Sequence, residues 1–159
     1  MIDQKTVLDL FDYCDGRLFW RVQLNPRAPV GAEAGTYNSA NGRRYVRIKG
    51  RAYLAHRLIF LFHHGYLPPE IDHIDLNKNN NKIENLRAAT PAQNQKNKSL
   101  QRNNTSGHKN ICFKKGRWVV ELKIAGKQQY FGRFEDLDLA ILVASEARDK
   151  YHGEFANHG

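Results

Sequence analysis

The sequence predicts an α+β protein built from two small units. Segments in both halves alternate apolar and polar residues, as half-buried strands do, and residues 117–124 are the clearest example. Residues 137–151 instead carry apolar and small side chains at helical spacing, which indicates a helix packed on a sheet. Between the halves, residues 95–107 contain one apolar residue, Leu100, and are rich in Lys, Asn and Ser. We interpret this stretch as a linker.

The first half is expected to hold a short helix, several strands and a buried helix. Residues 6–13 predict the short helix, and residues 16–22 and 43–57 predict strands with glycines at their turns. Residues 56–65 form an apolar stretch that ends in Gly65. This stretch predicts the buried helix, because glycine commonly ends a helix.

Residues 70–97 are crowded with asparagine, which suits helix and strand interiors poorly because its amide competes for backbone hydrogen bonds. We expect an extended piece at Ile71–Ile74 and a polar loop. A helix should begin at about Pro91, with Thr90 as its N-cap. Four asparagines of the loop are expected to be turn residues without a chemical role: Asn77, Asn79, Asn80 and Asn81.

Residues 107–159 predict three strands followed by one helix. The strands are expected at 110–114, 116–124 and 127–134, joined by short turns with Gly and Lys. The two-residue period of a strand assigns one face of this sheet to the helix: Ile111, Phe113, Trp118, Val120, Leu122 and Ile124. The other face should be exposed and cationic, and it holds Lys114, Arg117, Val119, Glu121, Lys123, Gln128 and Tyr130.

The net charge of +9 is concentrated in one part of the chain. Residues 95–133 hold ten Lys or Arg and one acid, whereas residues 134–159 hold six acids and two bases. A basic block in a folded segment predicts a surface for a polyanion. Charge alone does not distinguish RNA, DNA and an acidic membrane.

Other features of the composition narrow the class of protein. No apolar run approaches the length of about 20 residues needed to span a bilayer, and the acidic N-terminus is unlike a secretory signal. We therefore expect a cytoplasmic protein of a bacterial or phage-infected host cell. The two cysteines, Cys14 and Cys112, form no paired motif, so no structural zinc site is expected.

Asp72 and His73 are the candidate reactive pair. Hydrolysis of a phosphodiester needs an activated water and stabilisation of the charge that develops on the phosphate and the leaving oxygen. A neutral histidine can act as the base, and one divalent cation can stabilise the charge. Oxygen donors suit Mg²⁺, so Asp72 and a side-chain amide would serve as ligands. On an extended strand, His73 would point the opposite way, towards the water.

Residues 71–97, IDHIDLNKNNNKIENLRAATPAQNQKN, resemble the HNH endonuclease motif in the form found in phage and intron homing endonucleases. The likeness covers about residues 17–97. It implies a ββα-metal fold, double-stranded DNA as substrate, and Mg²⁺ or another divalent cation such as Mn²⁺. It implies four roles: His73 as general base, Asp72 as metal ligand, Asn85 as the residue that braces the loop and orients the histidine, and Asn94 as the metal ligand on the helix. Asn97, one helical turn further, is the alternative helix ligand.

Two residues upstream of the motif have no derived task. His56 and Arg57 both occur in the family's lead-in segment. We expect His56 to be a hydrogen-bonded packing residue, with a second catalytic base as the alternative.

Residues 107–157 resemble an AP2 DNA-binding domain, a three-stranded sheet packed on one helix. The resemblance rests on GRWVVELK, QYFGRFEDLDLAILVAS and YHGEFAN. It implies that one face of the sheet contacts DNA through Lys114, Arg117, Glu121, Lys123, Gln128 and Tyr130. In the linker, Lys96, Lys98 and Arg102 are expected to contact the phosphate backbone, with a solvated linker that makes no such contacts as the alternative.

The sequence thus predicts a site-specific endonuclease of the homing type, monomeric, in three parts. These are an HNH nuclease domain at 1–97, a basic linker at 98–106 and an AP2-like domain at 107–159. The alternatives are a DNA-binding regulator without catalysis and a non-specific HNH nuclease.

Overall fold

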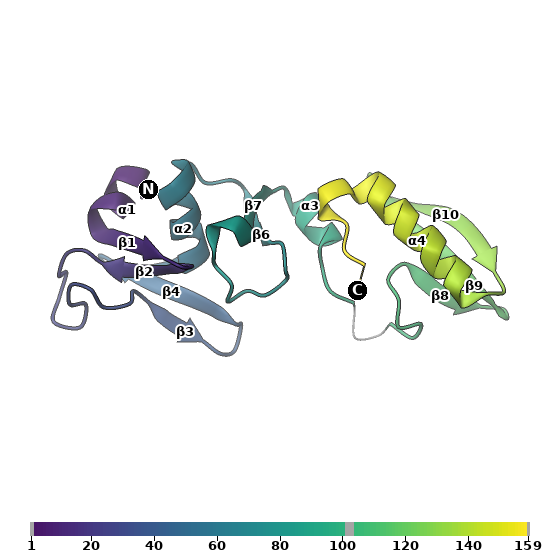
Figure 1. Cartoon of the computed structure of the whole chain (residues 1–159), viewed down its shortest axis with the longest axis horizontal. Helices are drawn as coiled ribbons and strands as arrows, with labels where there is room; N and C mark the ends of the chain where they lie inside the picture. The colour runs from purple at the N-terminus through teal and green to yellow at the C-terminus, as the bar shows by residue number, and fades with distance from the viewer. Residues whose placement is uncertain (1, 101–103, 159) are drawn as a thin grey trace. The chain divides into compact units, whose positions relative to one another are not determined.

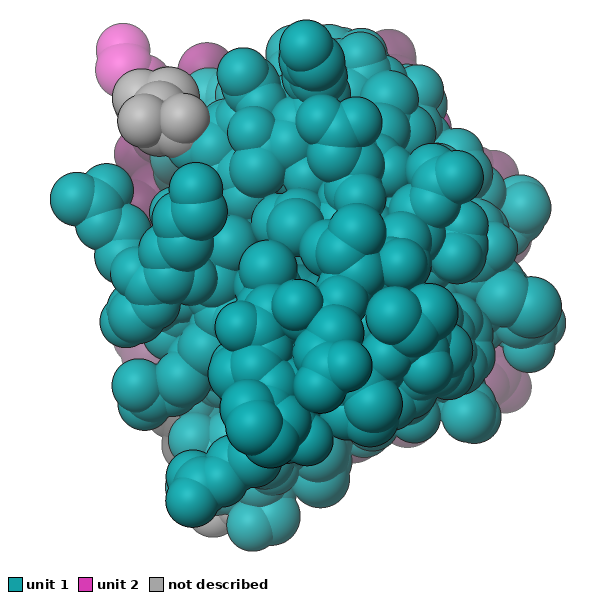
Figure 2. Space-filling view, turned by 90° about the vertical axis from the view of Figure 1, so that its left-hand side faces the viewer, with its two compact units in different colours: residues 1–91 teal, residues 92–159 magenta. Residues whose placement is uncertain are grey.

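The computed structural model describes residues 2–100 and 104–158. The chain forms two compact units, Met1–Pro91 and Ala92–Gly159, which Figure 2 distinguishes by colour. The elements of the first unit are α1 (Gln4–Leu10), β1 (Phe11–Cys14), β2 (Arg17–Trp20), β3 (Thr36–Asn38), β4 (Arg43–Ile48), β5 (Arg51–Leu54), α2 (Ala55–His64), β6 (Glu70–His73), η1 (Ile83–Asn85) and β7 (Leu86–Ala89) (Figure 1). Helix α3 (Pro91–Lys96) begins at the boundary. The second unit continues with β8 (Ile111–Lys114), β9 (Arg117–Ile124), β10 (Lys127–Phe134), α4 (Leu137–His152) and η2 (Gly153–Phe155).

The first unit contains three small antiparallel sheets around one core. Strands β1 and β2 form a hairpin, β3, β4 and β5 form a meander, and β6 pairs with β7. The apolar residues of α2 lie at the centre of the core, with Leu58, Ile59 and Phe60 almost fully buried. Helix α2 ends at Gly65 in the left-handed region, as expected. The predicted α+β class is therefore confirmed.

The first helix ends earlier than the sequence predicts. Asp3 caps α1 by accepting a hydrogen bond from the Thr6 N–H, and the helix stops at Leu10. Phe11 opens β1 and is fully buried, with its ring centroid 4.6 Å from that of Trp20 on β2. This tertiary contact requires extended backbone at 11–14, so packing overrides the local helical pattern.

The second unit is a three-stranded sheet with α4 packed on one face (Figure 1). The strand order is β10-β9-β8, all antiparallel. Alanines on α4 allow close approach to the sheet, and the buried cluster consists of Ile111, Val120, Leu122, Ala140, Ala144 and Ala147. The predicted strands and helix are confirmed, and the predicted helix-facing side is confirmed for Ile111, Trp118, Val120, Leu122 and Ile124.

Two side chains of this sheet differ from the expected burial. Phe113 is 55% exposed, although its ring lies 4.7 Å from that of Trp118, because it stands at the end of β8. Val119, on the expected outer face, is buried. Its neighbours across the sheet are Cys112 and Arg133. Among the described residues, no helix is both long and apolar enough to cross a membrane.

Candidate active site

Asp72 and His73 are consecutive residues of strand β6, which pairs with β7. Their side chains therefore point to opposite faces of this two-stranded sheet. The register pairs Asp72 with Arg87 and His73 with Leu86. Both Asp72 and His73 are buried, at 4% and 6% exposure. Polar side chains buried to this degree need partners, because an unsatisfied buried group costs about 1–3 kcal/mol.

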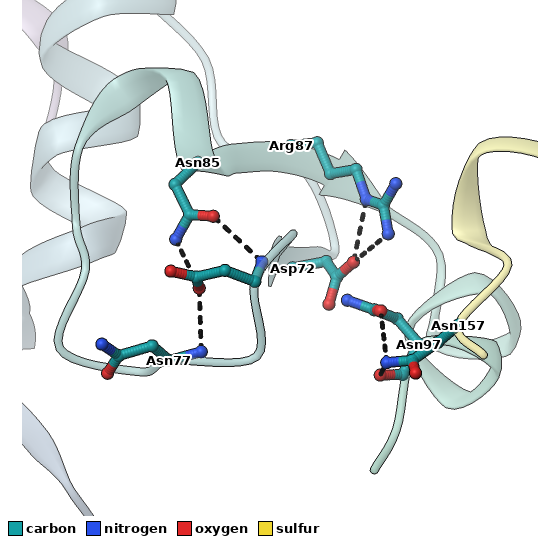
Figure 3. A network of polar contacts seen from close by, with 7 residues as sticks. Asp72, Asn77, Asn85, Arg87, Asn97 and Asn157 are labelled. Carbon is teal, nitrogen blue, oxygen red and sulfur yellow. Dashed lines mark hydrogen bonds and ion pairs between the residues drawn. The ribbon is translucent and has the colours of Figure 1, made fainter. Parts of the chain in front are cut away.

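The partner of Asp72 is Arg87, directly opposite on β7. The Arg87 Nε and Nη2 atoms donate to Asp72 Oδ2 at 2.8 and 2.7 Å (Figure 3). This ion pair orients the buried carboxylate. Arg87 was not among the predicted site residues. The signal was available, since Arg87 is the basic residue of the strand that follows the polar loop.

The partner of His73 is Asn81, which the sequence analysis assigned to the turn alone. His73 Nε2 lies 2.9 Å from Asn81 Oδ1, and Asn81 is buried. An amide oxygen can only accept, so Nε2 carries the proton and Nδ1 is the basic nitrogen of the neutral ring. Burial lowers the pKa of His73, against the opposing effect of the Asn81 hydrogen bond. The ring is therefore neutral at neutral pH.

The hydrogen bonds of the Asn85 side chain are made within the loop. His73 Nε2 is contacted by Asn81 and not by Asn85. Asn85 Nδ2 donates to Asp75 Oδ1 at 2.8 Å, and Asn85 Oδ1 accepts from the Asp75 N–H at 3.0 Å (Figure 3). Its Nδ2 also donates to the Asn80 backbone oxygen at 2.8 Å. Burial acts to raise the pKa of Asp75, but hydrogen bonds from Asn80, Asn85 and Asn77 outweigh it and lower that pKa. Asn77 and Asn79 make local turn contacts, as expected.

The β1–β2 hairpin supports the loop from behind. The Tyr13 hydroxyl accepts from the Ile83 N–H at 3.1 Å, and Lys82 Nζ lies 2.7 Å from Asp15 Oδ1. Gly16, at φ +79°, comes so close that a Cβ there would stand 2.8 Å from the Lys82 nitrogen. The segment that holds Asn81 is thus fixed by residues far earlier in the chain.

His56 lies against His73, at the start of α2. The two ring centroids are 5.1 Å apart in an edge-to-face arrangement, and His56 Nε2 is 3.4 Å from Arg43 Nη1. Burial, with the positive charge of its neighbours, lowers the pKa of His56 to about 3. Arg57 donates to the carbonyl oxygens of Pro68 and Pro69, which ties α2 to the segment before β6.

The expected helix ligands, Asn94 and Asn97, belong to the second unit. Within that unit, Asn97 is buried and Asn157 Nδ2 donates to its backbone oxygen at 3.0 Å and its Oδ1 at 3.2 Å (Figure 3). A carboxylate and an amide oxygen are hard donors that fit Mg²⁺. The pairing of Asp72 with Asn94 around a metal stays a prediction. Among the described residues, no group of three or more His, Cys, Asp and Glu side chains could hold a metal ion.

The predicted DNA-facing side of the second unit is exposed, and two of its cations are paired with acids. Lys114 Nζ lies 3.1 Å from Glu121 Oε2, and Arg117 Nη2 lies 2.6 Å from Glu135 Oε1. Tyr130 is 63% exposed. The register places Tyr130 opposite Glu121, and Gln128 opposite Lys123.

Arg133 belongs to the same side of the sheet but was not among the predicted residues. The predicted linker residues differ in their contacts and exposure. Arg133 crosses the sheet end and donates to the carbonyl oxygens of Lys114 and Lys115. Lys96 Nζ donates to the backbone oxygen of Tyr151 at 3.1 Å, and Lys98 is exposed. The expected contact residue Arg102 lies outside the described residues.

Comparisons with known proteins identify a family for part of the chain. Residues 53–96, from β5 to α3, match the HNH endonuclease family model. Over 88 residues the chain is 39% identical to Protein 3.8 of Escherichia phage T7, covering 54% of this chain and 72% of that protein. No solved structure matches the chain. The chain therefore belongs to the same family as Protein 3.8 of Escherichia phage T7, and its residues 53–96 are an HNH endonuclease domain.

Proposed function

We propose that the protein is a DNA endonuclease that hydrolyses phosphodiester bonds with His73 as general base and one divalent cation bound by Asp72 and Asn94. The observation that carries this proposal is the buried pair of interactions at the end of β6, His73 with Asn81 and Asp72 with Arg87. Both lie inside the segment that matches the HNH endonuclease family.

The proposed roles follow from the hydrogen bonds of the site. Asn81 fixes the tautomer of His73, so Nδ1 takes the proton from water. Burial keeps the imidazole neutral before the reaction, by lowering the pKa of His73. Arg87 orients the Asp72 carboxylate, as partners of metal-ligating carboxylates commonly do. The cation, Mg²⁺ or Mn²⁺, would stabilise charge on the phosphate and the leaving oxygen.

The choice of Asn94 over Asn97 is part of the proposal. Asn97 is buried and receives two hydrogen bonds from Asn157, one of them on its amide oxygen. It therefore has a structural task in the second unit, where it joins the start of the linker to the C-terminal segment. An Asn97→Ala variant should lose stability, whereas Asn94→Ala should lose metal-dependent cleavage.

We further propose that the second unit binds double-stranded DNA through the outer face of the β8–β10 sheet and gives the nuclease its site preference, as in homing endonucleases. The support is the exposed set of Tyr130, Lys123 and Gln128, together with the basic balance of residues 95–133. Steep loss of DNA affinity with rising salt is the expected signature.

Cleavage of plasmid DNA tests the proposal. Wild type is incubated with supercoiled plasmid in Mg²⁺ or Mn²⁺, beside His73→Ala and the control His64→Ala, which removes an exposed histidine of α2. Wild type and the control should cut, and His73→Ala should lose at least about 10²-fold in rate, the usual size of a general-base contribution. Equal cleavage by His73→Ala contradicts the assigned base. Binding without cleavage by wild type would instead favour a DNA-binding regulator.

A non-specific HNH nuclease is the second candidate. The observation in its favour is the neutralisation of Lys114 and Arg117 by acids, which leaves fewer cations for base contacts. Cleavage mapped on a library of duplexes separates the two: a defined site supports the homing type, and cuts spread over all sequences support the second candidate.

A further inference from the structure

Arg43 is a half-buried cation beside the candidate active site. It begins β4 and lies outside the segment that matches the HNH endonuclease family. Its Nη1 is 3.4 Å from His56 Nε2, and the His56 ring packs edge-to-face on His73 at 5.1 Å. The guanidinium is therefore next to the imidazole that we assign as general base.

The charge of Arg43 is not compensated by an acid. Its neighbour Arg44 is paired with Glu33 at 3.1 Å, and Arg87 is paired with Asp72. Within residues 2–100 and 104–158, no carboxylate forms an ion pair with Arg43. A half-buried guanidinium without a carboxylate partner can pair with an anionic ligand.

His56 has the form needed to hold this guanidinium. An arginine can only donate, so the His56 Nε2 atom accepts and the ring is neutral, with its proton on Nδ1. His56 is 5% exposed and fixed at the first turn of α2. A neutral acceptor positions the cation without neutralising it, whereas a carboxylate in the same place would cancel its charge.

We propose that Arg43 binds the non-bridging oxygens of the scissile phosphate and that His56 is the residue that positions it. The inference rests on the proposed function, since it assigns a phosphate to the space beside His73. Guanidinium donors match phosphate oxygens in geometry and charge. A cation placed there stabilises charge that grows on the phosphate as the water attacks. The expected contribution is therefore to turnover more than to DNA affinity.

The test compares Arg43→Gln with Arg47→Gln, which removes the same charge from an exposed position of the same strand. Both full-length variants are assayed for cleavage in Mg²⁺ and for DNA affinity without metal. Arg43→Gln should lower kcat by about 10²–10³-fold, with a change in affinity no larger than that of Arg47→Gln. Equal kcat for the two variants overturns the proposal. Absence of cleavage by wild type would instead overturn the proposed nuclease function.

Chemical rescue distinguishes a direct role of Arg43 from a structural one. Guanidinium ion added to folded Arg43→Ala should restore part of kcat and should not change Arg47→Ala. For His56, Gln keeps an acceptor oxygen and Leu does not, so His56→Gln should retain more turnover than His56→Leu at equal thermal stability. Failure of guanidinium rescue together with equal turnover of the two His56 variants would contradict the assignment.

Discussion

The two units of this protein treat their polar residues in opposite ways. In the first unit, Asp72, His73 and Asn81 are buried and each has a defined partner, so their positions are fixed before any ligand arrives. In the second unit, Lys114, Arg117 and Tyr130 are exposed, and the acids that pair with the cations lie on the surface. The difference is that expected between a site that performs chemistry, which requires fixed geometry, and a surface that adapts to a long polyanion.

Acid should destabilise the first unit through His56. The pKa of His56 is about 3 in the folded state and 6.5 in an unfolded chain, so below pH 6.5 the unfolded state binds a proton that the folded state does not. Stability is therefore present above pH 6.5 and is lost as the pH falls towards 3, by up to about 1.4 kcal/mol per pH unit. Trp20 reports the first unit and Trp118 the second, so fluorescence of a Trp118→Phe variant follows the first unit alone. His56→Gln should flatten its pH dependence, and an unchanged slope would contradict a buried neutral His56.

Removal of the Asn81 amide should impair turnover without loss of DNA affinity. Asn81→Ala leaves the His73 Nε2–H without its acceptor and releases the tautomer, so kcat should fall by about 10–100-fold, as for other residues that orient a catalytic group. Asn79→Ala is the matched control, because it removes an exposed amide of the same loop that donates to the Tyr37 hydroxyl and does not contact His73. Cleavage at the wild-type rate by both variants would show that the Asn81–His73 hydrogen bond does not contribute to turnover.

The close approach of the β1–β2 hairpin can be isolated with two glycines of the same backbone angle. Gly16 and Gly50 both have φ +79°, but a Cβ at Gly50 meets nothing within 4 Å, whereas at Gly16 it meets the Lys82 backbone. Both alanine variants carry left-handed strain of about 1–2 kcal/mol. Gly16→Ala should lose a further ~1–3 kcal/mol, typical of overpacking, and should also lower kcat. Equal unfolding free energies by urea titration would show that the contact is not constraining.

The smallest effects are expected on the sheet of the second unit. Lys123→Gln should weaken DNA binding and reduce the salt slope by about 1, as for loss of one phosphate contact. Lys114→Gln should have a smaller effect, because Lys114 Nζ already interacts with Glu121 and is less available to a phosphate. The comparison is read from binding isotherms at several salt concentrations. A larger slope change for Lys114→Gln would place the DNA elsewhere on the unit.

The sequence predicted the elements better than the contacts between them. Helix α2 and the β8–β10 meander follow from local periodicity, which is why they were found. The Asn81–His73 contact depends on the path of a loop held by Asn85 and Asp75, and spacing alone cannot distinguish one asparagine from another four residues on. Arg87 required knowledge of the β6–β7 register. The early end of α1 required the packing of Phe11 on Trp20.

The β1–β2 hairpin has a consequence for how this HNH endonuclease domain could be inherited or reused. The segment that matches the HNH endonuclease family begins at residue 53, yet Tyr13, Asp15 and Gly16 lie before it and hold its loop. A graft of residues 53–96 onto another protein would carry Asp72 and His73 without the scaffold that fixes them. The smallest transferable segment therefore includes the whole first unit and helix α3 with Asn94. A recombination breakpoint between Gly16 and residue 53 would separate the motif from its support.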